Sequence, residues 1–330
     1  MTSVLESLNQ GLYRALASDK RVVLLGQDLL DPYGGAFKVT RGLSSAFPER
    51  VLSTPISEAG IVGAAAGMAL RGLRPVVEIM FGDFLTLAAD QLINHAAKYR
   101  WMYNDQVQVP MVVRTPMGGR RGYGPTHSQT LEKHFIGAPG LRVLAPAALG
   151  SPGDLLAETV QTSADPVLFI ENKLLYLEKL PGEAELSEFD LQQSGSTYLL
   201  AVRGAPQPDV TVAAYGYMAH LARKLLLSLA YEAEIFVELV IPTCLSPLDM
   251  QPILGSLERS QRLITLEEGT FTLGWGAEVL AQAASALGPR LKAARRVATA
   301  DLPIPASGPL ESAVLPGESA IRAAIWDILN

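Results

Sequence analysis

A glycine-rich segment carries the side chains best suited to proton transfer. It runs from Arg114 to Gln129 and holds His127 beside Ser128, with further arginines and several glycines. The segment follows an apolar run typical of a buried strand, so we expect it at the carboxyl edge of a sheet, where ligands bind in wound α/β folds. Imidazole exchanges protons near neutral pH, which predicts that His127 acts on a bound ligand. The alternative is a histidine that only bonds the loop's own backbone.

An acidic residue stands at the predicted start of a helix. Glu58 follows Ser57, a residue type that caps helix N-termini, and Gly60, Gly63 and Gly67 lie in the same helix. Three glycines inside one helix cost about 1 kcal/mol each relative to alanine. We expect the close approach of another backbone to offset this cost, which predicts a subunit interface. The simpler alternative for Glu58 is a first-turn acid that favours the helix dipole.

A third candidate group lies on the next helical stretch. Phe84 follows a glycine turn, and it either belongs to the core or offers its ring face to a flat heteroaromatic ligand. The polar residues Asp90, Gln91, Asn94 and His95 stand among alanines on that stretch. They form either a solvated face or the wall of a site.

The elements that must position these residues follow from the apolar pattern. Short, continuously apolar runs alternate with helical stretches, which is typical of a wound α/β domain with a parallel sheet. Strands are expected at 21–27, 75–80, 110–114, 141–145 and 166–170. Helices are expected at 1–19, 59–71, 84–101 and 152–162.

A second α/β series follows a polar, acidic stretch at 181–196, which is interpreted as the connection between domains. Strands are expected at 209–215, 235–241 and 262–267, with an edge strand at 296–304. Helices are expected at 217–230, 248–258, 275–287 and 319–329. The prediction is an α/β protein of two wound domains with mainly parallel sheets, one over 1–182 and one over 183–330.

Composition excludes several classes of function. The 330 residues include 27 basic and 33 acidic ones, and a formal charge of −6 without a basic cluster argues against nucleic-acid binding. No phosphate loop, dinucleotide fingerprint or nucleophile elbow occurs, and the one cysteine, Cys244, offers no metal-ligand pair. The N-terminus lacks the features of a secretion signal and no apolar run could span a bilayer, so a cytoplasmic location is expected.

Taken in order, the motifs resemble the beta subunits of thiamine-diphosphate-dependent 2-oxoacid dehydrogenases of the pyruvate, branched-chain and acetoin types. The resemblance covers nearly the whole chain. In the first domain its carriers are Ser57-Glu58-Ala59-Gly60, Glu78-Ile79-Met80-Phe81 through Phe84, Ala89-Asp90-Gln91, Arg114-Thr115-Pro116-Met117-Gly118-Gly119, Gly124-Pro125-Thr126-His127-Ser128-Gln129, Gly140-Leu141-Arg142-Val143-Leu144-Ala145-Pro146 and Asp165-Pro166-Val167-Leu168-Phe169-Ile170-Glu171. In the second they are Asp209-Val210-Thr211-Val212, Ser246-Pro247-Leu248-Asp249, Glu267-Glu268-Gly269 and Gly274-Trp275-Gly276-Ala277-Glu278.

The resemblance implies a transketolase-like, pyrimidine-binding first domain, a transketolase C-terminal second domain, and thiamine diphosphate as the cofactor. The match to Glu58 hydrogen-bonds the aminopyrimidine and promotes formation of the reactive ylide. The match to Phe84 stacks on the pyrimidine ring, and Gln91 belongs to the cofactor-binding set. The chemistry then belongs to the cofactor, which acts as an electron sink for decarboxylation.

On the substrate side the resemblance places Arg114, His127 and Ser128, with His127 handling protons or the incoming lipoyl group. Two departures from the family lie near the substrate entrance. Asn104-Asp105-Gln106 stands where the family often has Gly-Gly-Gln, and Arg120 stands where it often has a third glycine. They leave the substrate and the acceptor open.

The resemblance also concerns metals. The family's magnesium and diphosphate motif begins Gly-Asp-Gly, whereas here Gly82-Asp83 runs into Phe84 and Gly153-Asp154 into Leu155. Magnesium is therefore expected on a partner alpha subunit, in an α2β2 heterotetramer with the cofactor between alpha and beta chains. A potassium ion is a further expectation, through backbone carbonyls of Val160, Ser163 and Asp165.

Three functions are compatible with these residues. The favoured one is a decarboxylase subunit that passes the acyl group of a 2-oxoacid to lipoamide, with a lipoyl acyltransferase as a further partner. The first alternative is a thiamine-dependent carboligase of the same fold. The second is a catalytically silent scaffold, against which the retention of Glu58 and His127 argues.

Overall fold

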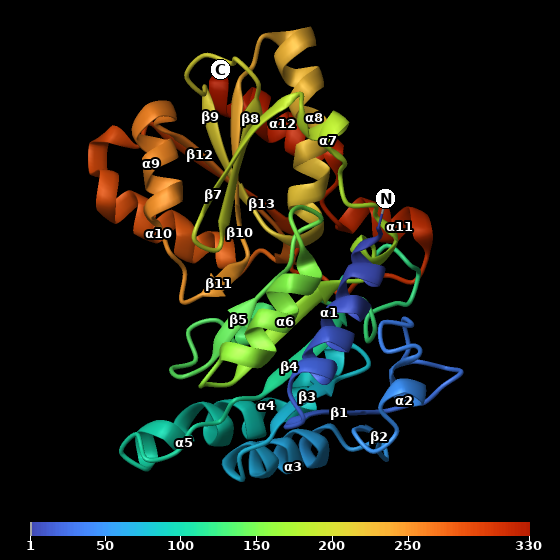
Figure 1. The fold of residues 1–330 in the computed structure, drawn as a ribbon. Helices are drawn as coiled ribbons and strands as arrows, with labels where there is room; N and C mark the ends of the chain where they lie inside the picture. Colours follow the sequence, from blue (N-terminus) through green and yellow to red (C-terminus); the bar gives the residue numbers. More distant parts are fainter. Residues whose placement is uncertain (1) are drawn as a thin grey trace. The chain divides into compact units, whose positions relative to one another are not determined.

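The computed structural model describes residues 2–330, which divide into two compact units (Figure 1). The first unit holds the chain up to Gly118 together with His134–Leu180. The second unit holds Gly119–Lys133 and Pro181–Asn330. The segment Gly119–Lys133 thus belongs to the second unit, although its neighbours in sequence on both sides belong to the first.

The strands of the first unit run parallel in the order β5-β6-β4-β3-β1-β2. They are β1 (Val22–Gly26), β2 (Val51–Ser53), β3 (Arg74–Glu78), β4 (Val112–Met117), β5 (Arg142–Leu144) and β6 (Val167–Asn172). Every residue of β1 and β4 is buried, so both faces of these strands are covered. This explains the continuous apolar runs, from which the strands other than β2 were predicted as separate elements.

Helices lie on this sheet. They are α1 (Val4–Ser18), α2 (Leu43–Ala46), α3 (Glu58–Leu70), α4 (Leu85–Asp90), α5 (Ala97–Met102) and α6 (Pro152–Thr162), with short 3-10 turns at Gly82–Phe84, Glu132–His134 and Leu175–Leu177. Helices α1 and α6 pack together where Gly11 meets Gly153: a Cβ atom on Gly11 would lie 2.2 Å from the carbonyl oxygen of Gly153. Only glycine permits this close approach.

The helix expected at 84–101 is not a single regular α-helix. Between α4 and α5 the chain forms a π-helix over Gln91–Ala96, a rare form that is frequent at functional sites. After α5, Asn104 and Asp105 have φ angles of 52° and 59°. Asparagine and aspartate tolerate this left-handed conformation, so the turn persists where the family often has two glycines.

The sheet of the second unit is mixed, in the order β13-β12-β9-β10-β8-β7. The first four strands are parallel, and β8 and β7 run antiparallel at one edge. The strands of this unit are β7 (Phe189–Ser194), β8 (Thr197–Val202), β9 (Val210–Ala214), β10 (Val237–Pro242), β11 (Cys244–Ser246), β12 (Arg262–Thr270) and β13 (Ala293–Thr299). The stretch 181–196, interpreted above as the connection between domains, contains a short helix and, from Phe189 onward, the edge strand β7. All residues of β7 after Phe189 are exposed, which gives an edge strand the polarity of a linker.

The helices of the second unit are α7 (Glu183–Leu186), α8 (Gly216–Ala233), α9 (Gln251–Ser260), α10 (Trp275–Leu287), α11 (Gly308–Val314) and α12 (Glu318–Leu329), with a 3-10 turn at Gly288–Arg290. The expected edge strand is confirmed as β13, but it ends before Pro303 and Pro305. Among the described residues, no helix has the length and apolar character needed to cross a membrane.

Candidate active site

Glu58 is the first residue of α3, and its side chain is buried in the first unit. Gln27, the residue after β1, donates from Nε2 to Oε1 of Glu58 at 3.1 Å. Among residues 2–330, no hydrogen bond reaches the second carboxyl oxygen, Oε2. Ser57 occupies the N-cap position as expected, but its side chain forms no capping hydrogen bond. The carboxyl group is thus held by one oxygen and has the other available for a ligand.

The other expected cofactor residues lie on the elements that follow β3. The Phe84 ring meets the Phe81 ring edge-on, with centroids 5.8 Å apart, and an aromatic row continues through Phe37 to Tyr176. Gln91 opens the π-helix, and a Cβ atom on Gly63 of α3 would lie 3.4 Å from its Oε1. Gln91 therefore lies next to the helix that begins with Glu58.

The aromatic row ends at a buried ion cluster. Arg114, only 1% exposed, donates to both oxygens of Glu171, with an Nε–Oε1 distance of 2.8 Å, and also to Glu78. The Tyr176 hydroxyl donates to Glu171 Oε2 at 2.6 Å. The guanidinium of Arg114 is buried between two carboxylates, and its salt bridges join β4 to the neighbouring strands β3 and β6. The expected place of Arg114 on the substrate side stays a prediction.

Burial and charge shift the pKa values in this cluster. Burial raises the pKa of Glu78 against the opposing charge of Arg114. Burial alone would lower the pKa of Arg114, but the charges of Glu171 and Glu78 outweigh it and raise that pKa above its usual range. Burial and the neighbouring Glu171 hold the pKa of Tyr176 well above its usual value. The arginine therefore stays charged and the tyrosine stays protonated.

His127 lies in the loop Gly119–Lys133 of the second unit. Its side chain is partly buried, and its Nδ1 atom is 3.0 Å from the hydroxyl of Thr126. Its backbone N–H donates to the carbonyl of Gly124 at 3.3 Å. Ser128 beside it is fully buried, and its expected place on the substrate side stays a prediction. Of the residues expected there, only His127 has a partly accessible side chain.

The same loop ends in a buried acidic cluster that the sequence reasoning missed. Glu132 accepts a hydrogen bond from the Tyr215 hydroxyl and lies near Glu267 and Glu268 of β12. Arg296 donates to Glu267 at 3.1 Å. All three carboxylates are buried, and within the described residues one oxygen of each lacks a hydrogen-bond partner. An isolated glutamate just beyond a recognised motif carries no signal that it is buried.

Desolvation dominates the titration of this second cluster. Burial raises the pKa of Glu132 to about 7, against the hydrogen bond from Tyr215 that favours the charged form. Burial also raises the pKa of Glu267, although Arg296 opposes it. Burial and the charge of Glu132 hold the pKa of Tyr215 well above its usual value. Glu132 is therefore protonated in part of the molecules at neutral pH.

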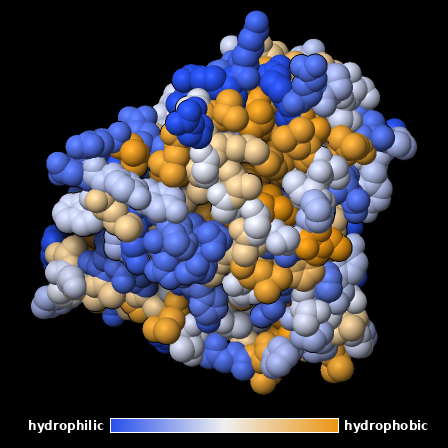
Figure 2. Space-filling view, turned by 90° about the horizontal axis from the view of Figure 1, so that it is seen from below, coloured by the Kyte–Doolittle hydropathy of each residue, from blue (hydrophilic) through white to orange (hydrophobic). Residues whose placement is uncertain are grey.

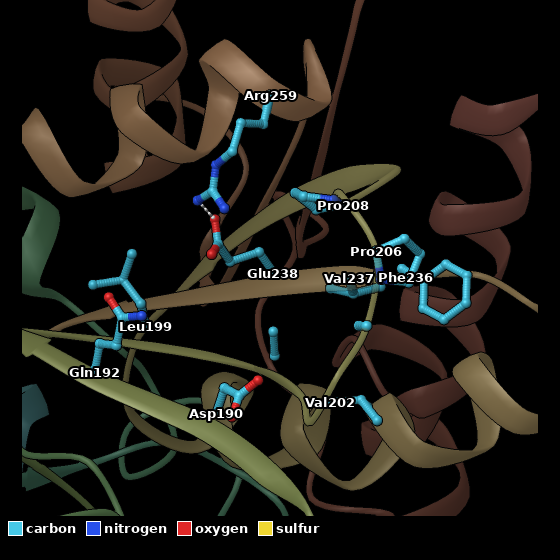
Figure 3. A pocket seen from close by; sticks show the side chains of 12 residues that line it. Asp190, Gln192, Leu199, Val202, Pro206, Pro208, Phe236, Val237, Glu238 and Arg259 are labelled. Atoms are coloured by element: carbon cyan, nitrogen blue, oxygen red, sulfur yellow. Dashed lines mark hydrogen bonds and ion pairs between the residues drawn. The ribbon is translucent and has the colours of Figure 1, made fainter.

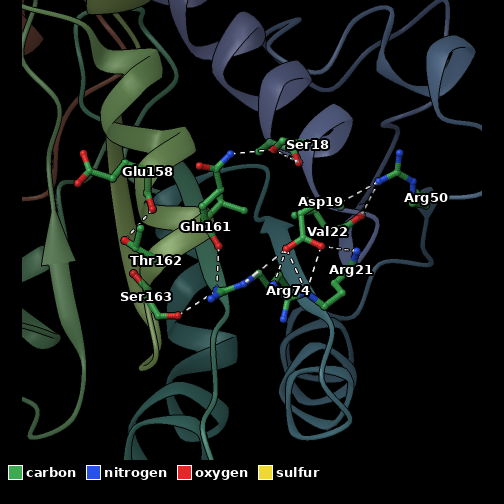
Figure 4. A network of polar contacts seen from close by, with 12 residues as sticks. Ser18, Asp19, Arg21, Val22, Arg50, Arg74, Glu158, Gln161, Thr162 and Ser163 are labelled. Atoms are coloured by element: carbon green, nitrogen blue, oxygen red, sulfur yellow. Dashed lines mark hydrogen bonds and ion pairs between the residues drawn. The ribbon is translucent and has the colours of Figure 1, made fainter.

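The residues expected to bind potassium already face a cation. Arg74 donates from Nη1 to the carbonyl oxygens of Val160 and Ser163, both at 3.0 Å. The side chain of Asp165 pairs with Arg100 at 3.0 Å. Figure 4 shows the Arg74 guanidinium between Ser163 and the Asp19 side of the network. As they stand, these residues do not fit a potassium ion unless the guanidinium moves away.

The most enclosed hollow described in the second unit lies apart from the candidate residues. It has a volume of about 150 Å³ and lies beside β7, β8 and β10 (Figure 3). Its polar wall is the ion pair between Glu238 and Arg259. Within residues 2–330, no three histidine, cysteine, aspartate or glutamate side chains lie close enough together to hold a metal ion. That this chain has no magnesium site of its own stays a prediction.

Comparison with known proteins places both units in described families. Residues 2–178 match the transketolase pyrimidine binding domain, and residues 200–321 match the transketolase C-terminal domain. A solved split-gene transketolase, described as an inactive beta4 tetramer, superposes with a TM-score of 0.74 at 20% identity over 99% of this chain and 98% of that one. The expected fold, two α/β domains of the transketolase type, is confirmed.

Several curated relatives match over almost the entire chain. The beta-1 subunit of the mitochondrial pyruvate dehydrogenase E1 component from Oryza sativa subsp. japonica is 37% identical, over 98% of this chain and 85% of that protein. The beta subunit of acetoin:2,6-dichlorophenolindophenol oxidoreductase from Cupriavidus necator is 34% identical, over 98% and 96%. The beta subunit of 3-methyl-2-oxobutanoate dehydrogenase from Mycobacterium tuberculosis is 31% identical, over 99% and 92%. The chain belongs to the beta subunits of the thiamine-diphosphate-dependent 2-oxoacid dehydrogenases, which decarboxylate 2-oxoacids together with an alpha subunit.

Proposed function

We propose that this beta subunit activates thiamine diphosphate through Glu58 and assists transfer of the acyl group to lipoamide through His127. The observation that carries the proposal is the buried Glu58 carboxyl group, held at one oxygen by Gln27 and open at the other. When bound, the cofactor supplies the electron sink for decarboxylation. The chain's own residues bind it, orient it and exchange protons with it.

Glu58 is suited to a proton exchange with the aminopyrimidine. Gln27 fixes the orientation of the carboxyl group, so that Oε2 is the oxygen offered to a ring nitrogen. Burial strengthens a hydrogen bond formed there, because the local dielectric is low. Phe84 is proposed to stack its ring on the pyrimidine, and Gln91, which lies next to α3 at Gly63, is proposed to complete the contacts. These three residues form the proposed cofactor-binding set of the first unit.

His127 is the proposed proton donor for the acyl-transfer step. Opening a lipoyl disulfide produces a thiolate, and imidazole can supply the proton that this sulfur takes up near neutral pH. The Thr126 hydroxyl beside Nδ1 restrains the ring orientation. A lipoyl acyltransferase is accordingly proposed as the partner that receives the acyl group.

Assembly with the alpha subunit is proposed to use the face of α3. Gly60, Ala64 and Gly67 are exposed along this helix, and no atom lies within 4 Å of a Cβ atom placed on Gly67. Nothing in the chain itself therefore requires that glycine. Figure 2 views the molecule from the side where α3 and α5 lie in Figure 1, and apolar side chains gather there. Trp101 and Met102 of α5 are 88% and 61% exposed, as a subunit interface requires.

The proposed assembly is an α2β2 heterotetramer in which the alpha subunit holds magnesium and the diphosphate. The support is chemical: this chain has no Gly-Asp-Gly motif, and its described residues provide no cluster of metal ligands. Isothermal titration of the isolated chain with thiamine diphosphate and magnesium should show no tight binding. Tight, magnesium-dependent binding would refute the assignment of the metal to the partner. A cytoplasmic location remains a prediction, and potassium is not included in the proposed mechanism.

The activity is tested in the complex with its alpha subunit, using pyruvate, 3-methyl-2-oxobutanoate and acetoin as substrates. Glu58→Ala should abolish deuterium exchange at the thiazolium C2 atom and lower turnover more than substrate affinity. His127→Ala should leave this exchange intact and slow lipoamide acylation about 100-fold, which is typical of losing a positioned acid. Wild-type exchange in the Glu58 variant, or wild-type acylation in the His127 variant, would refute the respective role. Acyloin formation without lipoamide reduction in the wild type would identify a carboligase instead.

A further inference from the structure

The loop that carries His127 begins with an unusual backbone conformation. Arg120, Gly122 and Gly124 have φ angles of 68°, 68° and 76°. Glycine adopts this left-handed region freely, but an arginine there pays a steric cost. A residue kept at such an angle must be held by its surroundings.

A buried carboxylate from the C-terminal part of the chain accepts hydrogen bonds from this backbone. Glu311 of α11 is 3% exposed; its Oε1 accepts from the N–H of Arg120 at 2.8 Å and its Oε2 from the N–H of Gly122 at 3.0 Å. Glu268 of β12 accepts from the N–H of Gly119 at 2.7 Å. Both oxygens of Glu311 are thus used on one turn of the loop. Hydrogen bonds to an ionised acceptor are about twice as strong as neutral ones.

The side chain of Arg120 points into the same unit rather than away from it. Its Nη2 atom donates to the carbonyl of Pro316 at 2.6 Å, and its guanidinium lies over the Tyr217 ring at 5.4 Å. The residues facing the loop glycines come from the same C-terminal segment. A Cβ atom on Gly124 would lie 3.4 Å from Cβ of Ala306. The C-terminal segment therefore contacts both the backbone of the loop and the side chain of Arg120.

We propose that Glu311 is a positioning residue for the acyl-transfer step, because it fixes the turn Gly119–Gly124, which directly precedes the part of the loop that carries His127. This inference rests on the proposed function of His127. Glu311 makes no contact with the reacting atoms in this assignment; it acts through the backbone of the loop. Displacing a catalytic group by about 1 Å can cost a factor of about 100 in rate, so the arrangement of this turn matters for the chemistry.

The test uses the complete complex with its alpha subunit and compares four variants. Glu311→Ala removes both oxygens that accept hydrogen bonds from the loop, and Glu311→Gln keeps one. Arg120→Gly removes the side chain that contacts Pro316 and Tyr217 but leaves Glu311 in place. Glu318→Gln, at an exposed position on α12, is the matched control. Three quantities are measured: amide hydrogen exchange of the peptide that covers 119–126, deuterium exchange at the thiazolium C2 atom, and the kcat and KM of lipoamide acylation.

Glu311→Ala should speed amide exchange in the loop at least tenfold and lower the kcat of acylation by about tenfold to 100-fold. Exchange at C2 should stay within twofold of wild type, because Glu58 lies in the other unit. For Glu311→Gln, the rate of loop exchange and the kcat of acylation should lie between those of Glu311→Ala and wild type. For Glu318→Gln, both should equal those of wild type. A purely structural role would instead slow acylation and C2 exchange together.

Unchanged loop protection in Glu311→Ala would overturn the inference. So would faster loop exchange with an unchanged acylation rate. If Glu311→Ala does not fold, Glu311→Gln and Arg120→Gly decide the question by the same measurements. If His127→Ala acylates lipoamide normally, the proposed role of His127 fails, while the loop exchange of the Glu311 variants still shows whether this carboxylate holds the loop.

Discussion

Each unit buries carboxylates beside a tyrosine hydroxyl, but the two clusters differ in how their charge is balanced. In the first unit, Glu78 and Glu171 both contact the guanidinium of Arg114. In the second unit, Glu132 accepts a hydrogen bond from the hydroxyl of Tyr215 and, among the described residues, has no salt bridge to a cation. The first cluster pairs every carboxylate with a cation, and the second leaves one carboxylate without one.

The difference shows how the same residue type serves two purposes. A paired buried carboxylate fixes structure, and removing its cation leaves an uncompensated charge. An unpaired buried carboxylate takes up a proton instead, as the pKa of about 7 for Glu132 indicates. In the second unit, Glu132 also belongs to the loop that holds His127. Its charge is therefore expected to change near neutral pH.

The largest effect on stability is expected from Arg114→Met. The substitution leaves two buried carboxylates without a cation, which typically costs about 3–5 kcal/mol. Denaturant unfolding of the complex measures the loss. Arg14→Met is the control, because Arg14 pairs with Asp154 on the exposed surface and should cost less than about 1 kcal/mol. Equal effects of the two substitutions would show that burial of the pair is unimportant.

A smaller and pH-dependent effect is expected from Glu132→Gln. Burial raises the pKa of Glu132 from 4.5 to about 7, so protonation stabilises the folded state fully below about pH 4.5, and this stabilisation is lost as the pH rises through 7. The glutamine variant stays neutral. It should gain roughly 3 kcal/mol relative to wild type between pH 4.5 and 8. Unfolding curves at several pH values measure this, with the exposed Glu258→Gln as control. A difference that does not change with pH would contradict the prediction.

A third prediction tests whether Gln27 positions Glu58 in the first unit, as Glu311 is proposed to position His127 in the second. Gln27→Leu removes the donor to Oε1 of Glu58, and leaving a buried acceptor without its partner costs about 1–3 kcal/mol. Deuterium exchange at the thiazolium C2 atom should therefore slow about tenfold or more. Gln161→Leu, at an exposed position on α6, should have no effect. Unaltered exchange in the Gln27 variant would mean that the hydrogen bond from Gln27 is not needed to orient the Glu58 carboxyl group.

The smallest effect is expected from exchanging potassium for sodium. Arg74 already donates to the carbonyl oxygens of Val160 and Ser163, so no further cation is needed there. Activity should change less than twofold, and the melting temperature of the complex should stay the same. A melting temperature that rises with potassium but not with sodium would show that the ion binds after all. Arg74→Met provides a variant in which such a dependence should appear.

Much of the fold follows from the sequence because parallel strands covered on both faces are continuously apolar. Helices α6 and α10 have the predicted bounds, since both begin and end at strong local signals. Strands β7 and β8 both escaped prediction. All residues of β7 after Phe189 are exposed, and β8 (Thr197–Val202) lies between the predicted connection and the first strand predicted for the second domain. Patterns of this kind report local burial, so an element without a buried face is invisible to them.

The site was predictable only where a motif marks it. Glu58, Phe84, Gln91 and His127 came from motifs that resemble a family, and their roles remain proposals. Arg114 belonged to such a motif as well, yet it is buried between carboxylates. Glu132 and Glu311 escaped notice because each acts through partners more than 80 positions away in sequence. Long-range pairing leaves no local trace.

The membership of Gly119–Lys133 in the second unit has a consequence for how the chain folds. The N–H of Gly119 meets a carboxylate 149 positions later in the chain, and that of Arg120 meets one 191 positions later. Contacts of such long sequence separation form slowly, because loop closure comes before any gain. During synthesis the loop cannot form its hydrogen bonds to Glu311 until that residue has been made. A fragment that begins at Pro181 would lack Glu132 as well, so we expect that such a fragment does not fold as an independent domain.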